Sequence, residues 1–304
     1  MKLFYRIILF FLVLLNFETT VGQQDPQYTQ YMYNTMVINP GYTGSIGHFS
    51  ATTLVRSQWV GIDGAPQTQT LSFHSPIGYS NIGLGMNIIN DKLGPSNETY
   101  FDANISYTIR TSEEGKLAFG LRLGGRLLNI DWSKGIFKDP DVVFNQNINS
   151  RFLPTVGAGL YYYKPTWYLG LSVPNFLRTD HYDDFIESVA EERLHFMLIA
   201  GVVFDLTEDI KFKPAAITKV VSGAPLSLDI SGNFMLYERF TIGAAWRWDD
   251  SISTLIGIQV TETLNIGYAY DLTTSNYRNY NAGTHEVLLR LSVNKPKLKS
   301  PRFF

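Results

Sequence analysis

The residues best suited to catalysis or metal binding in this 304-residue chain are five histidines, and their spacing argues against both. None belongs to a His-Glu-x-x-His or similar pattern. Serines are common, but no Gly-x-Ser-x-Gly nucleophile elbow is present. The absence of cysteine removes thiol chemistry and cysteine-ligated zinc. We therefore predict that the chain is not an enzyme and has no cofactor or metal site. The histidines are His48, His74, His181, His195 and His285.

Three short motifs resemble ligand-binding loops only weakly. The glycine pairs at 83–85 and 120–125 resemble phosphate loops, but they lie inside strand patterns. In a strand, glycine marks a bend or a close approach of another backbone. The stretch 131–135 resembles the start of a calcium loop, but it lacks the glycine at position six and the closing glutamate. We predict no ligand site at any of the three.

The first residues predict export. Lys2 and Arg6 precede an apolar run at 7–15, and small residues follow at Thr20 and Gly22. This pattern is typical of a signal peptide, here residues 1–22 with cleavage before Gln23. The alternative is an uncleaved membrane anchor. A large exported domain without disulfides fits a bacterial envelope, and a net charge of −2 gives no indication of a nucleic-acid partner.

The elements that must position the remaining polar residues are strands. Only 17% of residues are charged and 14% are aromatic. Apolar residues alternate with polar ones through most of the chain, as in 101–110. This period of two is typical of half-apolar β-strands. We predict an all-β fold with strands at 48–59, 68–75, 81–90, 98–110, 116–130, 155–163, 166–173, 193–206, 210–220, 226–236, 240–248, 252–260, 264–272 and 284–294, fourteen in all.

The predicted connections are unequal. Links at 111–115, 164–166, 206–209, 237–239 and 261–263 are tight, whereas those at 60–67, 91–97, 131–154, 174–192 and 273–283 are longer, with a short exception near Asp249. Tight turns on one side and long loops on the other are typical of transmembrane antiparallel β-barrels in contact with outer-membrane lipid. The alternative is a soluble sandwich or a lipocalin-like barrel. In the membrane reading, the long loops lie outside the cell and both mature termini are periplasmic.

The two faces of the strands differ as a membrane barrel requires. Many aromatic residues of the apolar face fall near predicted strand ends, where interfacial girdles are expected. These are Trp59, Phe101, Tyr162, Trp167, Phe204, Phe240 and Trp248. The other face carries charges that we expect to pair in the lumen. They are Arg56, Asp102, Arg110, Arg122, Arg126, Asp205, Asp229, Arg247, Asp271, Glu286 and Arg290.

The segment before the barrel, residues 23–47, is too aromatic for a disordered leader. We predict that it packs into the periplasmic mouth or the lumen, and that Asn39-Pro40-Gly41 turns the chain into the first strand. The alternative is a periplasmic docking arm that orders only on a partner. The barrel would cover 48–294 and a basic tail 295–304, which is either a solvated end or a docking tail. The expected plug residues are Tyr28, Tyr31, Met32, Tyr33, Asn39 and Pro40.

Several blocks resemble one family. The sequence QQDPQYTQYMYN at 23–34, NPGYTGS at 39–45, RSQWVGIDGAP at 56–66 and SFHSP at 72–76 resemble the PorP/SprF family of the type IX secretion system in gliding and related Gram-negative bacteria. Shorter matches follow along the chain. They are VPNF at 173–176, KP at 213–214, AWR at 245–247, GYAYD at 267–271 and SPRFF at 300–304.

The resemblance implies a non-enzymatic barrel in the cell outer membrane. Family members support secretion or surface anchoring of a partner, such as a gliding adhesin, through its C-terminal signal domain, or join the secretion machinery. The loop with Trp59, Gly61, Gly64 and Pro66 is then a candidate partner loop. The alternative function is an outer-membrane channel for small solutes, which the charged lumen favours.

Overall fold

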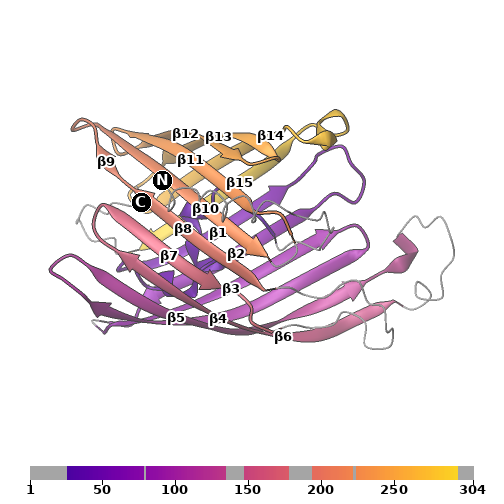
Figure 1. Ribbon diagram of the computed structural model, residues 1–304, viewed down its shortest axis with the longest axis horizontal. Coiled ribbons are helices and arrows are strands. Elements are labelled where there is room, and N and C mark those ends of the chain that lie inside the picture. The colour runs from indigo at the N-terminus through magenta and orange to yellow at the C-terminus, as the bar shows by residue number, and fades with distance from the viewer. Residues whose placement is uncertain (1–25, 79, 135–146, 178–193, 222–223, 294–304) are drawn as a thin grey trace, which may run out of the picture.

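Figure 1 shows a computed structural model of the chain, which forms a closed antiparallel β-barrel. The structure describes residues 26–78, 80–134, 147–177, 194–221 and 224–293. The predicted signal peptide and the basic tail lie outside the described residues. Among the described residues, no helix is long and apolar enough to cross a membrane.

Fifteen β segments make up the sheet, and β8 and β9 are two parts of one strand because both pair with β10 on either side of Val203. The barrel therefore has fourteen strands, and this prediction is confirmed. The segments are β1 (Phe49–Ser57), β2 (Gln67–Pro76), β3 (Ile82–Leu93), β4 (Ser96–Arg110), β5 (Lys116–Ile130), β6 (Ile148–Tyr163), β7 (Trp167–Val173), β8 (His195–Val202), β9 (Phe204–Asp205), β10 (Ile210–Val221), β11 (Ser227–Leu236), β12 (Phe240–Arg247), β13 (Ser251–Gln259), β14 (Leu264–Thr273) and β15 (Thr284–Val293).

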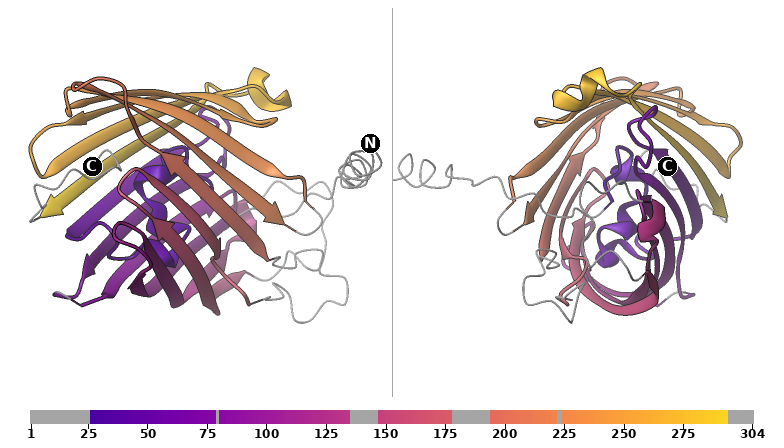
Figure 2. Two further views of the ribbon diagram at one scale, coloured as in Figure 1. Left: turned by 60° about the vertical axis from the view of Figure 1, so that its left-hand side comes forward. Right: turned by 90° about the vertical axis from the view of Figure 1, so that its right-hand side faces the viewer.

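The sheet has no free edge. Each strand pairs with its neighbours in sequence, and the last strand returns to the first, with Phe49 opposite Val293. Closure satisfies the backbone hydrogen bonds of every strand, which is the condition for crossing hydrocarbon without helices. Figure 2 shows the ring of strands from its end.

The faces separate as the alternation predicts. In β4, Asp102, Asn104 and Ser106 are buried inside the barrel, whereas Phe101 and Ile105 are 42% and 45% exposed on the outside. Such outward apolar side chains recur around the barrel. A soluble sandwich would bury them, so the structure is that of an outer-membrane barrel, which exposes them to lipid.

The two ends of the barrel carry different connections. The turn end has the links at 77–81, 111–115, 164–166, 206–209, 237–239 and 260–263, and β1 begins and β15 ends there. The long-loop end has the links at 58–66, 131–147, 174–194 and 274–283, together with shorter ones at 94–95, 222–226 and 248–250.

Two predicted loops are wrong. The link at 91–97 is only Gly94 and Pro95, because β3 and β4 extend until Leu93 pairs with Ser96. The link at 131–154 ends earlier, since β6 begins at Ile148. These extensions contain many polar residues on both faces, as a sheet that projects into water permits, so the alternation that marks a strand fades there. The extension also moves Phe101 away from a strand end, whereas the other six girdle aromatics lie at or beside ends.

The barrel wall is uneven in height. Strands β3 to β6 contain 12 to 16 residues, and we call them the long wall. Strands β11 to β13 contain 8 to 10, and we call them the short wall. About 9–11 residues suffice for a tilted membrane strand, so the long wall projects beyond the membrane.

Candidate functional site

The N-terminal segment occupies the lumen, as the end view in Figure 2 shows. Every residue from 28 to 43 is buried, and the segment folds into three short 3₁₀ turns, Tyr31–Tyr33, Thr35–Val37 and Pro40–Tyr42. We call residues 28–44 the plug. All six expected plug residues lie within it and are buried.

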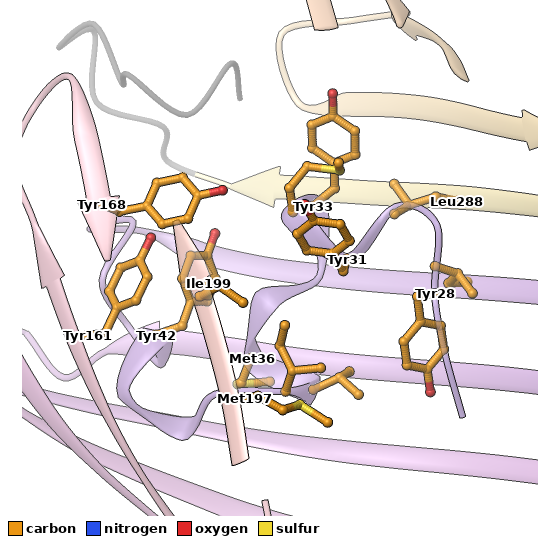
Figure 3. Close-up of a cluster of buried hydrophobic side chains, with 14 of the residues drawn as sticks. Tyr28, Tyr31, Tyr33, Met36, Tyr42, Tyr161, Tyr168, Met197, Ile199 and Leu288 are labelled. Atoms are coloured by element: carbon orange, nitrogen blue, oxygen red, sulfur yellow. The ribbon is translucent and has the colours of Figure 1, made fainter. Parts of the chain in front are cut away.

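The plug forms the main apolar core of the molecule, which in a membrane barrel lies inside rather than between sheets. Tyr31, Tyr33 and Met36 pack with Tyr161, Tyr168, Ile199 and Leu288 of the wall (Figure 3). Burial raises the pKa of the Tyr31 and Tyr33 phenols above its ordinary value, so both stay neutral at physiological pH. The Tyr33 and Tyr168 rings also lie 5.2 and 5.8 Å from the Lys213 ammonium of β10, within the range of a cation–π contact.

The direction of the plug differs from the prediction. Thr29 contacts Asp271 and Glu286, which lie within three residues of the long-loop ends of β14 and β15. At the other end of the plug, Thr43 O accepts a hydrogen bond from Ser106 and Gly44 N donates to His74, both near the turn end. The plug therefore starts at the long-loop end and finishes at the turn end, where β15 also ends, so the prediction that the chain enters and leaves the barrel on the same side is wrong. Alternation reveals which residues are buried but not the direction in which a chain threads.

Side chains of the barrel wall form hydrogen bonds with the plug backbone along its whole length. Arg122 Nη2 donates to the carbonyls of Met36 and Val37 at 2.8 and 2.7 Å. Ser172 Oγ donates to Ile38 O at 2.7 Å, and Ser106 Oγ donates to Thr43 O at 2.6 Å. Buried backbone groups that lack a ladder partner need such donors and acceptors. The wall therefore supplies the plug with the hydrogen bonds that a strand would have obtained from its neighbour.

A buried ion network holds the start of the plug. The Glu286 carboxylate accepts from the backbone N–H groups of Thr29 and Gln30 at 2.9 and 2.7 Å. Arg56 Nη1 lies 3.0 Å from Glu286 and 2.8 Å from Asp271, and all three side chains are at most 3% exposed. The Thr29 hydroxyl donates to Asp271. Buried charges of this kind are stable only when paired and hydrogen-bonded.

The predicted turn at residues 39–41 lies deep in the barrel. Asn39 Oδ1 accepts from Gly41 N at 2.8 Å, while its Nδ2 donates to Leu160 O at 3.0 Å. Pro40 opens the third 3₁₀ turn, where its missing N–H costs nothing. Asn39 thus both shapes the turn and fastens it to β6.

Glycines of the wall lie where the plug backbone comes closest. A Cβ on Gly120 would overlap Gly41 N, one on Gly83 would overlap Thr43 O, and one on Gly159 would overlap Asn39. In each motif that resembled a phosphate loop, one glycine, Gly83 or Gly120, therefore marks close approach of another backbone, one of the two readings that glycine in a strand permits. The inner face of the long wall is therefore complementary in shape to the plug.

The structure brings most of the predicted lumen charges together in small sets. Arg122 lies 3.8 Å from Asp102, and Arg247 binds Asp229 at 2.9 Å and Asp250 at 3.1 Å. Arg126 binds Glu98 at 3.3 Å. Glu98 is the first residue of the predicted strand 98–110 and faces inward like Asp102, so the alternation could have identified it as a lumen charge. Arg290 is buried.

Two predicted lumen charges are not in the lumen. Arg110 has the inward parity of β4, but it is the last residue of that strand and is exposed beside the turn. The Asp205 side chain, in β9, is 72% exposed. The alternation along a strand shows which side chains point inward, but it does not show whether an inward residue lies in the lumen or in the water beyond the strand end.

The loop with Trp59, Gly61, Gly64 and Pro66 lies at the long-loop end. Gln58 N donates to Pro66 O at 3.0 Å, which closes the loop. Gly61 and Gly64 adopt φ of +100° and +75°, which explains both glycines. Trp59 stacks on Tyr277 of the 274–283 loop at 5.1 Å between ring centroids. Tyr277 is a contact that the sequence did not predict.

Beside the start of the plug lies a small cavity of about 60 Å³. Tyr28, Val37 and Ile38 of the plug form one side, and Ile89, Tyr100 and Met197 form the other. Among the described residues, no group of three or more His, Asp or Glu side chains could hold a metal ion. The plug and the wall thus pack against each other around this cavity.

Comparison with known families identifies the chain. Residues 20–291 match the family of the type IX secretion system membrane protein PorP/SprF. The chain belongs to the PorP/SprF family. The match spans the plug and nearly all of the barrel, so the plug is part of the family segment rather than an addition to it. It also assigns the chain to a system whose machinery components are expected partners.

Solved structures with similar barrels share little sequence with this PorP/SprF member. Omp33 of Acinetobacter baumannii is 6% identical over 81% of this chain and 98% of its own, with a TM-score of 0.48. The toluene transporter TbuX of Ralstonia pickettii is 9% identical over 84% and 92%, with a TM-score of 0.48. A FadL homologue of Pseudomonas aeruginosa is 12% identical over 88% and 94%, with a TM-score of 0.46. No curated protein sequence matches the chain.

Proposed function

We propose that this PorP/SprF member is a non-enzymatic outer-membrane component that supports secretion or surface anchoring of a partner protein, such as a gliding adhesin, through the partner's C-terminal signal domain. The observation that carries the proposal is the moulded plug. A lumen filled by its own chain and fastened at both ends leaves the loops, rather than a pore, as the working surface.

The family match supports a role in handling a protein partner, because the type IX system secretes proteins. The long-loop end offers the most irregular surface, with links at 58–66 and 274–283 in the described chain. Loops on a rigid barrel are where binding residues concentrate. We propose that this end faces the outside and holds the partner, while the turn end faces the periplasm and the machinery.

The test is deletion of the gene in its own bacterium, followed by mass spectrometry of surface-exposed proteins. We expect at least one protein with a C-terminal signal domain to fall sharply at the surface and to return when the gene is restored. An unchanged surface level of every type IX cargo would contradict the proposal.

Two further parts of the proposal concern the ends of the chain. We propose that residues 1–22 are removed, so that mass spectrometry of the purified protein finds Gln23 as its first residue. We also propose that the basic tail from Lys295 docks to a periplasmic component. Truncation after Lys295 should then abolish co-purification of that component without loss of the folded barrel.

The alternative, a solute channel, rests on the charged inner face. Against it, Arg56, Arg126 and Arg247 each pair with a carboxylate instead of lining open space. Conductance of the purified barrel in a planar bilayer separates the two functions.

A further inference from the structure

Two loops at the long-loop end are joined by hydrogen bonds. Val60 N donates to Gly283 O at 2.9 Å, and Ala282 N donates to Val60 O at 2.7 Å. Trp59 N donates to the Thr284 hydroxyl at 3.1 Å. On the other side of the 58–66 loop, Gly94 N donates a hydrogen bond to Gly64 O at 2.8 Å. The loop is therefore held from both the β14–β15 side and the β3–β4 side.

Trp59 is held in a costly conformation. Its φ is +48°, in the left-handed region that bulky residues rarely adopt. The strained backbone places the indole almost parallel to the Tyr277 ring, with an interplanar angle of 24°. Strain of this kind persists when the surroundings enforce it, and it clusters at functional sites. The structure therefore holds this aromatic pair in one fixed arrangement.

Trp59 is partly buried, and its partner Tyr277 belongs to a more exposed surface. Tyr277 and Tyr280 are 54% and 73% exposed, and Arg278 between them is also exposed. We call Trp59, Tyr277, Arg278 and Tyr280 the aromatic platform. Its backbone lies beyond the strand ends and outside the sheet ladder, so the platform lies in water and not in hydrocarbon.

We propose that the aromatic platform is the anchor point for a protein partner at the long-loop end. Trp, Tyr and Arg are the residues that dominate the binding energy of protein interfaces. A surface that is already rigid loses little conformational entropy on binding. The inference rests on the proposed function, since a component of a protein secretion system has proteins as its passengers. The occupant is a folded domain of the anchored partner.

The test uses the C-terminal domain of the protein that disappears from the surface of the deletion strain. Binding of this purified domain to the full barrel in lipid nanodiscs is measured for wild type and three variants. The first is the double variant Tyr277→Ala and Tyr280→Ala. The second is Trp59→Gly, which removes the indole and also the backbone strain. The matched control is Tyr237→Ala, because Tyr237 is 70% exposed at the turn end and also has a positive φ, +54°.

We expect both platform variants to bind about tenfold more weakly or worse, and the control to bind within about twofold of wild type. Trp59→Gly should fold at least as stably as wild type, which separates lost binding from lost structure. Platform variants that bind like wild type would overturn this inference and leave the proposed function intact.

Two other outcomes also overturn the inference. If the deletion strain loses no surface protein, the proposed function fails and the inference fails with it. If platform variants keep the protein partner but lose binding of lipopolysaccharide vesicles, the platform recognises a glycan or lipid headgroup and not a protein.

Discussion

The long wall and the short wall of the barrel have the same outer face but different interiors. Both present apolar side chains to lipid, such as Ile105 on β4 and Ile256 on β13. Inside, glycines of the long wall lie against the plug backbone, whereas Gly243 and Gly257 of the short wall meet only neighbouring strands. Arg247 of the short wall pairs with Asp229 and Asp250 of its own wall, while Arg122 of the long wall donates to plug carbonyls.

The difference shows what shapes each surface. Contact with lipid requires apolar side chains on the outer face of every strand, so the alternation of apolar and polar residues is uniform around the barrel. The plug constrains the inner face only where the two are in contact. The glycines that admit the plug backbone, and the side chains that donate hydrogen bonds to its carbonyls, therefore lie on β3 to β7. The long wall therefore contacts the plug through the plug backbone, whereas the short wall contributes side chains such as Met235 to the apolar core around it.

The largest effect should come from the buried ion pairs. Arg56→Met leaves Asp271 and Glu286 buried without their cation, and Arg247→Met does the same to Asp229. Each should cost about 3–5 kcal/mol of folding free energy, measured by denaturant unfolding in detergent.

Only one of the two should loosen the plug. The chain has no native cysteine, so Asn34→Cys reports plug exposure through maleimide labelling. We expect faster labelling with Arg56→Met, since its network holds Thr29 and Gln30, and unchanged labelling with Arg247→Met. Equal labelling in both would show that the Arg56 network does not fasten the start of the plug.

The next effect concerns the glycines. Gly120→Ala forces a Cβ into the backbone of Pro40 and Gly41 and should destabilise the barrel by about 3 kcal/mol. Gly257→Ala is the matched control on the short wall, because its Cβ would meet Thr241 at an ordinary 3.4 Å. Heat-dependent gel mobility in detergent measures both. A Gly120→Ala barrel as stable as the control would mean that the plug does not press on the long wall.

The outer faces should respond alike. Ile105→Arg on the long wall and Ile256→Arg on the short wall each place a charge on the lipid face. Each should cost about 2–4 kcal/mol near the midplane in an unfolding titration. A cost below about 0.5 kcal/mol for either would show that its strand does not face lipid at depth.

The smallest effect on stability should come from labels at the two ends. Asn279 lies in the long 274–283 loop, and Glu113 lies in a tight turn at the opposite end. Asn279→Cys should react with an impermeant maleimide on intact cells, and Glu113→Cys should react only after the outer membrane is opened. Reversed labelling would invert the proposed orientation.

Much of the fold follows from sequence because membrane strands must alternate. Residues 101–110 and 264–272 show the pattern that predicts β4 and β14. The aromatic content of residues 28–33 likewise indicated burial. The alternation is lost at residues 91–97, since the sheet there leaves the membrane and one face need no longer be apolar.

Other features require three-dimensional contacts. Glu98 and Arg126 both lie in predicted strands, but alternation alone does not say which inward charges of neighbouring strands pair. The path of the plug from the long-loop end depends on where Thr29 and Thr43 bind. Gly83 and Gly120 read equally as bends or as close contacts until the plug is placed. Tyr277 and Tyr280 lie in a loop, where alternation carries no information.

The most direct test of the account is the conductance of the purified wild-type barrel in a planar bilayer. The central claim is that the moulded plug seals the lumen, so that the protein works through its surfaces. We expect no stable conductance steps, because residues 28–43 are buried and side chains of the barrel hold the plug at both ends. Large, long-lived steps like those of an open porin would contradict it.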